Sequence, residues 1–187
     1  MKTDLVSEPA LAEDASPVPE RPSLAQAIGF TAADLEANRS GLLSEMQHYR
    51  LRVRRWRSVA VGVAILLVAA FIATLLIFSG TRDNGSIILL IIGIGVTICN
   101  AALVGLFVRH WLRLSADIRE GRAILTSGEL ERVVKPVSKR VMQYMIRVDE
   151  AEIMVSKDVF EAFEHHQPYI LYLAPYTGTL LSAERGG

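Results

Sequence analysis

Two long stretches without a charged side chain constrain this chain more than any other feature. They cover residues 59–78 and 87–108. As α-helices they would be about 30 Å and about 33 Å long, which matches the hydrocarbon core of a bilayer. Uncharged runs of this length have no polar face to present to water, so two buried helices of a soluble protein are a poor alternative. The sequence therefore predicts an α-helical transmembrane hairpin with two spans over residues 59–108.

A short polar segment, residues 80–86, connects the two runs. Gly80 suits a helix C-terminus, and Ser86 can cap the second helix. A connection this short predicts antiparallel neighbouring helices. Because the N-terminal residues are polar and the first apolar run begins near position 59, we expect the first span to be an uncleaved anchor rather than a signal peptide.

Basic and tryptophan residues flank the hairpin on one side. We expect the following residues at the membrane interface: Arg50, Arg52, Arg54, Arg55, Trp56 and Arg57 before the first span, and Arg109, Trp111 and Arg113 after the second. The positive-inside rule then places both termini in the cytosol, with the tryptophan rings at headgroup level. The arginines surround the helix as a collar, which is an ordinary topology signal. Specific recognition of anionic lipid is the alternative.

The interior of the spans contains no Asp, Glu, Lys, Arg or His. Pumps, proton relays and ion-coupled transporters usually keep such a residue at depth. We expect Asn100 to hydrogen-bond to the neighbouring helix or to a second copy, and lining a pore is the alternative. Small residues lie four apart, Ala69 with Ala73 and Ala101 with Gly105, and they would allow close helix packing and a homo-oligomer.

The chain before the first span divides into two parts. Residues 1–29 are rich in Pro, Ala and Glu and predict a disordered tail. Residues 30–58 predict a juxtamembrane helical stalk. Two capping boxes start its helices, Thr31 with Asp34 and Ser44 with Gln47. A docking site for a partner is the functional alternative for this stalk.

After the second span the spacing of apolar residues changes from a helical to a strand-like pattern. Residues 109–120 predict a helical extension that ends at Gly121, and residues 121–187 predict a small β-rich (α+β) cytosolic domain. The predicted strands are residues 122–126, 130–134, 140–148, 151–155, 169–173 and 179–183, and the predicted helix is residues 156–164. We expect Ser127-Gly128 to separate the first two strands and Pro136 to break the pattern after them.

Catalytic, metal and cofactor signals are weak throughout the chain. The sequence has no phosphate loop, dinucleotide fingerprint or zinc-protease motif. The adjacent His165 and His166 would point about 100° apart on a helix, so they are more typical of solvated helix-end residues than of a metal site. Basic and acidic residues are equal in number, 20 each, which gives no indication of nucleic-acid binding. We therefore expect no enzymatic activity, no cofactor and no metal.

Five residues of the β-rich domain form a candidate surface for a partner or ligand: Tyr169, Tyr172, Tyr176, Ser182 and Glu184. Ser182 and Glu184 alternate on one face of a predicted strand, where a hydroxyl and a carboxylate could meet a ligand. Without a paired histidine they make no hydrolytic triad. Because strand tyrosines usually pack at the edge of a core, a structural role is the alternative interpretation.

Two segments carry a resemblance to known proteins. Residues 30–41, FTAADLEANRSG, with Gln47 soon after, resemble the N-terminal signature of a group of uncharacterised two-span membrane proteins seen mainly in prokaryotes. Residues 169–175, YILYLAP, followed by LLSAE at residues 180–184, are similar to the C-terminal signature of the same group. The resemblance covers about residues 30–184. It implies the two-span architecture and a bacterial inner membrane, and it implies no particular chemistry.

Three functions are compatible with this sequence. The first, which we favour, is a non-enzymatic membrane anchor or accessory protein that presents a cytosolic β-domain to a protein partner. The second is a membrane-tethered sensor or regulator that binds a small molecule. The third is a small oligomeric channel or transport component, for which only Thr97 and Asn100 offer polar pore-lining groups.

Overall fold

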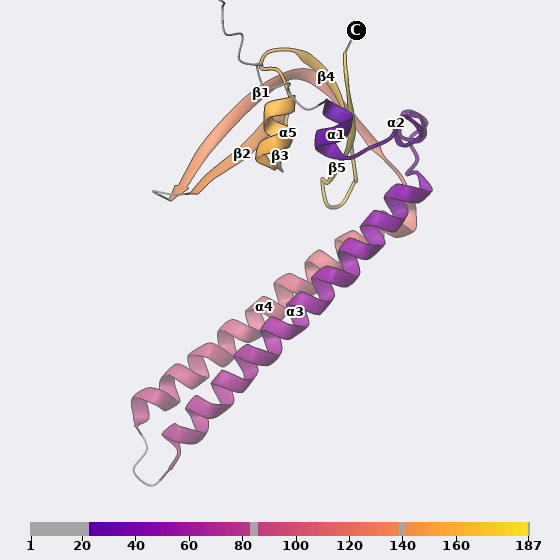
Figure 1. The fold of residues 1–187 in the computed structure, drawn as a ribbon. Helices are drawn as coiled ribbons and strands as arrows, with labels where there is room; N and C mark the ends of the chain where they lie inside the picture. The colour runs from indigo at the N-terminus through magenta and orange to yellow at the C-terminus, as the bar shows by residue number, and fades with distance from the viewer. Residues whose placement is uncertain (1–22, 83–85, 139–140, 187) are drawn as a thin grey trace, which may run out of the picture.

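A long helical stem carries a small β-domain at one end (Figure 1). The computed structural model describes residues 23–82, 86–138 and 141–186. Its helices are α1 (Leu24–Ile28), α2 (Ala32–Arg39), α3 (Glu45–Gly80), α4 (Ile87–Glu120) and α5 (Lys157–Ala162). Its strands are β1 (Ile124–Ser138), β2 (Val141–Val148), β3 (Ala151–Val155), β4 (Pro168–Leu173) and β5 (Leu180–Arg185).

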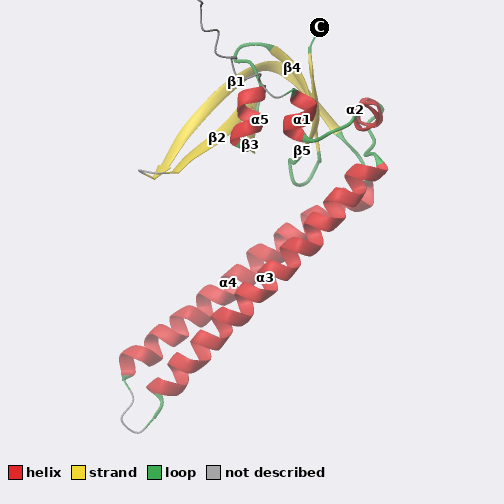
Figure 2. Cartoon of the chain, viewed as in Figure 1, coloured by secondary structure: helices red, strands yellow, loops and turns green. Residues whose placement is uncertain are grey.

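The stem consists of α3 and α4, which lie antiparallel and side by side (Figure 2). Both helices extend beyond the apolar runs, so that 36 and 34 residues give lengths of about 54 Å and about 51 Å. The predicted capping box of Ser44 with Gln47 starts α3, and Gly121 ends α4 in the left-handed conformation. Both helices are long and apolar enough to cross a membrane, and only 6% of the residues in the most apolar window of each are buried.

Glycines bring the two stem helices into close contact. A Cβ at Gly93 would lie 2.7 Å from Ile77 Cγ1, and a Cβ at Gly62 would overlap the ring of Phe107. Antiparallel packing at these two points places Asn100 near the level of Ala69, inside the seam between the helices. The Oδ1 atom of Asn100 is buried and has no hydrogen-bond partner among the described residues.

The predicted small-residue pairs divide between two faces of the stem. Ala73 is buried and Ala69 is half-buried, so this pair lies in the seam between α3 and α4. Ala101 and Gly105 are exposed, and a Cβ at Gly105 would have open space around it. The second pair therefore leaves a smooth outer strip on α4 and takes no part in packing within one copy.

The β-domain is built on one antiparallel sheet in the order β3-β2-β1-β4-β5. Its central strand, β1, is 15 residues long and changes partner along its length. From Ile124 to Glu129 it pairs with β4, and from Leu130 to Ser138 it pairs with β2. Figure 1 shows the β1–β2 hairpin extending away from the rest of the domain.

The expected division of residues 122–138 into two strands is wrong, because β1 continues through both expected breaks. Gly128 lies where β1 leaves β4 and approaches β2, and a Cβ there would lie 3.3 Å from Val148. Pro136 also lies within the strand, opposite Met142 and beside a register irregularity. This half of β1 has a single neighbour, so a residue without an N–H is tolerated there.

The remaining elements of the sheet agree more closely with the sequence pattern. The prediction of residues 151–155 matches β3, and the predictions for β2, β4, β5 and α5 differ by a few residues at their ends. Phe163 and Tyr169 meet edge to face in the core, with ring centroids 5.0 Å apart. Tyr144 of β2 packs on Phe160 of α5, so α5 covers one face of the sheet.

The N-terminal segment, residues 23–43, belongs to the β-domain. Residues 23–29, expected in the disordered tail, instead form α1 with a serine N-cap at Ser23 and a left-handed glycine at Gly29. Leu24, Ala27 and Ile28 of α1 pack against the core, where α1 contacts both α5 and β5. The rest of the predicted tail, residues 1–22, lies outside the described residues.

Backbone hydrogen bonds tie the N-terminal segment to the beginning of β1. Leu42 and Arg122 form an isolated antiparallel bridge. Leu43 donates to the Gly121 carbonyl at 2.9 Å, and Ala123 donates to the Gly41 carbonyl at 3.0 Å. The start of α3 and the end of α4 therefore lie together at one end of the stem.

Candidate functional site

A buried polar pair joins α2 to the edge strand β5. Asn38 Nδ2 donates to Ser182 Oγ at 2.6 Å, and the two residues are 1% and 0% exposed. Asn38 Oδ1 is also buried and has no partner among the described residues. A buried amide or hydroxyl without a hydrogen-bond partner is energetically costly, so this contact favours one position of α2 on the sheet. We call this region, where α2 and the first turn of α3 meet β4 and β5, the junction.

An ion pair on the rim of the junction extends the same contact. Arg39 Nη2 lies 2.5 Å from Glu184 Oε2, and the Tyr172 hydroxyl donates to Glu184 Oε1 at 2.7 Å. The hydrogen bond from Arg39 holds the pKa of the Glu184 carboxyl below its usual value, against the opposite effect of partial burial. Burial, reinforced by the Glu184 carboxylate, raises the pKa of Tyr172. The carboxylate is therefore held charged by two donors.

Asp34 links α2 to α3 from the other side of the junction. Its buried carboxylate accepts hydrogen bonds from the Thr31 backbone at 2.9 Å and from the Ser44 hydroxyl, with Arg50 Nη1 at 3.9 Å. Burial alone would raise the pKa of Asp34, but the donors from Ser44 and Thr31 lower it overall. The capping boxes predicted from sequence are thus joined to each other through one carboxylate.

Asp117 forms a third link, from the end of α4 to the turn between β4 and β5. Its carboxylate is fully buried and accepts from the backbone N–H groups of Tyr176 at 2.8 Å and Thr177 at 3.0 Å. The Tyr176 hydroxyl donates to Glu120, and this hydrogen bond raises the pKa of Tyr176. Both stem helices are therefore fastened to the same pair of strands.

Tyr172, Ser182 and Glu184 of the candidate partner or ligand surface lie together in the junction, but most of the five residues are not free to bind a ligand. Tyr169, Tyr172 and Ser182 are buried by the protein itself. Tyr169 accepts a hydrogen bond from the Glu164 backbone, and Glu184 is engaged by Arg39 and Tyr172. Tyr176 is the member of the set that remains exposed. The junction is consequently arranged to hold the N-terminal segment and stem on the sheet.

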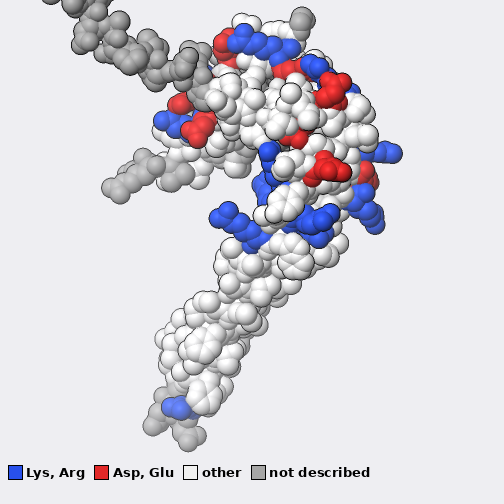
Figure 3. All heavy atoms as spheres, turned by 45° about the vertical axis from the view of Figure 1, so that its right-hand side comes forward, with Lys and Arg blue, Asp and Glu red and all other residues white. Residues whose placement is uncertain are grey.

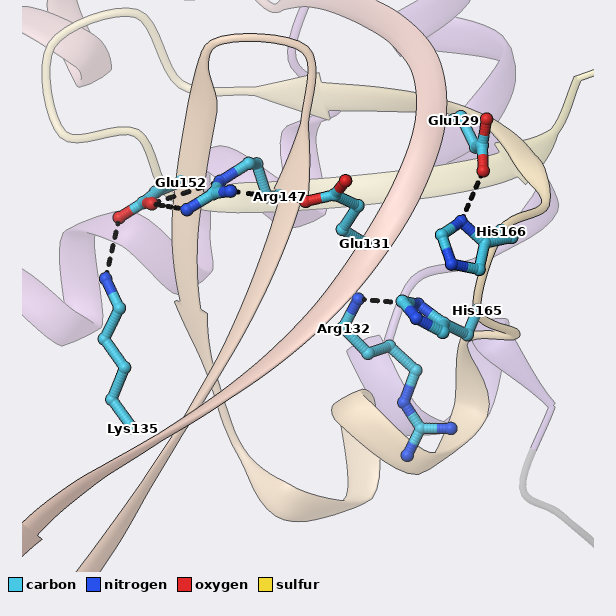
Figure 4. Close-up of polar contacts among 8 residues, drawn as sticks. All are labelled: Glu129, Glu131, Arg132, Lys135, Arg147, Glu152, His165 and His166. Atoms are coloured by element: carbon cyan, nitrogen blue, oxygen red, sulfur yellow. Dashed lines mark hydrogen bonds and ion pairs between the residues drawn. The ribbon is translucent and has the colours of Figure 1, made fainter.

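A ladder of ion pairs crosses the outer face of β1, β2 and β3 (Figure 4). Arg147 lies between Glu131, at 3.2 Å, and Glu152, at 2.5 Å, and Lys135 reaches Glu152 at 3.3 Å. Hydrogen bonds from Arg147 and Lys135 lower the pKa of Glu152. These side chains satisfy one another, so the ladder reinforces strand pairing and leaves little free charge.

The two adjacent histidines have different partners (Figure 4). His165 Nδ1 accepts a hydrogen bond from the Arg132 backbone at 3.0 Å, and His166 contacts Glu129. The two rings lie 3.8 Å apart at an angle of 38°. Within the described parts of the chain, no three His, Cys, Asp or Glu side chains are grouped to hold a metal.

Basic side chains gather at the end of the stem nearest the β-domain (Figure 3). We call this part, residues 50–57 and 109–113, the neck. Six of its arginines have no carboxylate within ion-pair distance among the described residues: Arg52, Arg54, Arg55, Arg57, Arg109 and Arg113. In the β-domain, by comparison, Arg39, Arg147 and Arg185 are each paired with a glutamate, and Arg132 lies over the ring of Phe160.

Arg50 behaves differently from the other predicted interface arginines. Its guanidinium turns away from the stem and donates to the Gly29 carbonyl, close to Asp34. It therefore connects the neck to the N-terminal segment.

A crevice of about 280 Å³ opens on the surface of the neck. We call it the tryptophan groove. It is lined by Arg55, Trp56, Val59, Phe107, Val108 and Trp111. Both tryptophans of the chain thus lie at one site, although they come from different helices. A second crevice, near Arg54, Arg57 and His110, opens beside the same Phe107.

Sequence reasoning missed the part that Asn38, Arg39 and Asp117 take in joining the stem to the sheet. Asp117 carries a detectable signal, because an acidic residue in the last turn of a helix is unfavourable beside the helix dipole unless it has specific partners. Asn38 and Arg39 carry none, since their partners are more than 140 residues away along the chain.

Comparison with other proteins adds no relative to this description. No family model, curated protein or solved structure matches the chain. The fold and site thus define a class by architecture alone: a small antiparallel β-domain from which an apolar helical hairpin projects.

Proposed function

We propose that this protein is an integral membrane anchor or accessory protein that presents a cytosolic β-domain to a protein partner. The proposal rests on the way in which the polarity and charge of the surface change along the molecule. An apolar stem is followed by a group of unpaired arginines and two tryptophans, and then by a domain whose ion pairs are internal. This order matches hydrocarbon, headgroups and water.

The same distribution of charge supports a particular orientation. The neck contains many arginines, whereas Arg82 lies at the opposite end of the stem and stacks on Phe78. By the positive-inside rule the neck, the β-domain and both termini lie in the cytosol. A bacterial inner membrane is the proposed location, and it rests on the sequence resemblance.

We expect a cysteine at Glu161 to be protected from a membrane-impermeant thiol reagent in intact cells, and a cysteine at Thr81 to react. Glu161 lies on the exposed face of α5, and Thr81 follows α3 at the far end of the stem. The measurement uses a Cys99→Ser background, because Cys99 is the one cysteine of the chain. Permeabilised cells serve as the control and should label both positions. Labelling of Glu161→Cys in intact cells would contradict the orientation.

The outer half of the sheet is the partner-binding region with the best support. Val134, Val137, Met142 and Met154 are exposed apolar residues of the β1–β2 hairpin and the edge strand β3. By strand register Val134 and Met142 lie on the face that carries the core residue Ile146, whereas Met154 lies on the opposite face, so a partner would contact both sides of this edge. The other half of the sheet is already covered by the N-terminal segment. A protein partner could bury these side chains and pair with the open edge of β3.

The two alternative functions have weaker support. A small-molecule sensor was expected to use a pocket lined by tyrosines, but Tyr169 and Tyr172 are buried in the domain. A channel was expected to use Thr97 and Asn100. The Thr97 hydroxyl donates to the Gly93 carbonyl of its own helix at 2.9 Å, and Asn100 lies toward the seam.

Purification of the tagged protein from its native membrane in mild detergent, with mass spectrometry of the bound proteins, tests the proposal. We expect a stoichiometric partner that is lost from a Met142→Lys, Met154→Lys variant and retained by Leu125→Lys. Leu125 is the matched control, since it is exposed and apolar but lies on the β4-paired half of β1. Recovery of the wild-type protein without any partner would favour the sensor or channel.

A further inference from the structure

We propose that the tryptophan groove binds one anionic phospholipid, with the phosphate on Arg55 and an acyl chain along the apolar wall. The inference rests on the proposed membrane insertion and goes beyond it, because insertion alone requires no specific lipid. It would make the neck a binding site as well as a topology signal.

The shape and lining of the groove favour an amphipathic occupant. Its walls are Val59, Phe107 and Val108 with the two tryptophan rings, so an acyl chain can contact apolar atoms from both helices. The groove opens onto the lipid-facing surface of the stem, which is apolar beyond this point. A free phosphate ion would use none of these apolar walls.

The charge of Arg55 favours an anion at the same site. Arg55 is half-buried against the groove, and no carboxylate of the described residues lies within ion-pair distance of it. Other arginines surround it, and residues 50–57 contain no acidic side chain. A guanidinium binds phosphate oxygens through a fork of N–H donors, and a lipid phosphate lies at the headgroup level that tryptophan also prefers.

The geometry also distinguishes Arg55 from its neighbours on the collar. Arg52 is exposed and does not line the tryptophan groove, although it carries the same charge one turn away. If the collar acted only through its overall charge, the two arginines would contribute equally. If the groove binds a lipid, Arg55 contributes more.

The two tryptophans provide a direct measurement, because they are the only ones in the chain and both line the groove. The full-length protein is placed in bilayers of phosphatidylcholine that contain a small fraction of lipid with brominated acyl chains, which quench tryptophan fluorescence on contact. We expect brominated phosphatidylglycerol to quench more strongly than brominated phosphatidylcholine at equal mole fraction. Arg55→Gln should lower this preference about tenfold, the size expected for the loss of a direct hydrogen bond to a charged phosphate.

Three variants control for charge and folding. Arg52→Gln and Arg82→Gln should keep most of the preference, and Arg55→Lys should retain part of it because the charge remains. Equal quenching by the two lipids would overturn the proposal, and equal losses for Arg52→Gln and Arg55→Gln would overturn the groove as the site. Absence of quenching by either lipid would overturn the proposed membrane insertion itself, so the two failures are distinguishable.

Discussion

Replacing Phe163 with alanine is expected to destabilise the β-domain by about 3–5 kcal/mol, the usual cost of removing a buried phenylalanine ring. Phe163 is fully buried, and its ring meets Tyr169 at 5.0 Å beneath α5. Single domains are stable by only about 5–15 kcal/mol, so this is a large fraction of the total. The buried stem residues Leu51 and Leu114 belong to a different core cluster from Phe163, so the helicity of the stem should persist.

Thermal unfolding and limited proteolysis of the detergent-solubilised protein measure this effect. We expect cleavage within the β-domain at temperatures where the wild type resists, while the far-ultraviolet helix signal changes little. Phe71→Ala is the matched control, because the same substitution is made at a stem position that is 65% exposed. A Phe163→Ala protein as resistant as Phe71→Ala would show that the described core does not hold the domain together.

The second large effect is expected at Asp117. Its substitution by leucine removes the acceptor for two backbone N–H groups in the turn between β4 and β5. Each unsatisfied, partly buried N–H costs about 1–3 kcal/mol, so we expect a loss of about 2–6 kcal/mol. The turn would also be held less firmly to α4, where the hydrogen bond from the Tyr176 hydroxyl to Glu120 would remain.

Hydrogen exchange at the amides of Tyr176 and Thr177 reports this loosening directly. We expect both amides to exchange faster in Asp117→Leu, and an intermediate rate in Asp117→Asn, which keeps one carbonyl acceptor. A matched control is Glu150→Leu, since Glu150 lies in the exposed turn between β2 and β3 and has no left-handed backbone conformation to strain. Unchanged exchange in Asp117→Leu would mean that the turn is held by other contacts.

The junction should weaken at acid pH through Glu184. Because the folded-state pKa of Glu184 lies below its ordinary value of 4.5, the unfolded chain binds more protons in that range. The contribution of this carboxylate is therefore complete above about pH 4.5 and is lost as the pH falls through the lower folded value. We expect the difference in melting temperature between wild type and Glu184→Gln to narrow below pH 4.5. A difference that stays constant down to pH 3.5 would contradict this account.

The sequence predicted the features of this fold that depend on neighbouring residues. An apolar run specifies a helix by itself, and a capping box joins residues three apart, so α3 and the start of α2 were predicted correctly. The sequence pattern did not predict that β1 is one continuous strand, because this depends on two partner strands whose pairings with β1 meet next to Gly128. No local pattern at residues 122–138 reports that exchange of partners.

The candidate site was predicted less well, for a related reason. The alternation of Ser182 and Glu184 on one strand face correctly indicates that both point the same way, and both meet α2. What the alternation cannot indicate is the identity of the covering element, because Asn38 lies 144 residues away. Side chains that the sequence pattern left available for a ligand are in fact bound by another segment of the same chain.

The bridge between Leu42 and Arg122 has a practical consequence. The chain leaves the β-domain and returns to it at adjacent positions. The apolar stem could therefore be deleted without separating the parts of the β-domain. Leu51 and Leu114 still pack beneath Leu181, so a shortened chain would keep α3 up to Leu51 and resume at Leu114, joined by a tight interhelical turn. Such a chain would isolate the domain for study in aqueous buffer. It would also shorten, by less than half, the loop that folding must close before α2 can pack on β5.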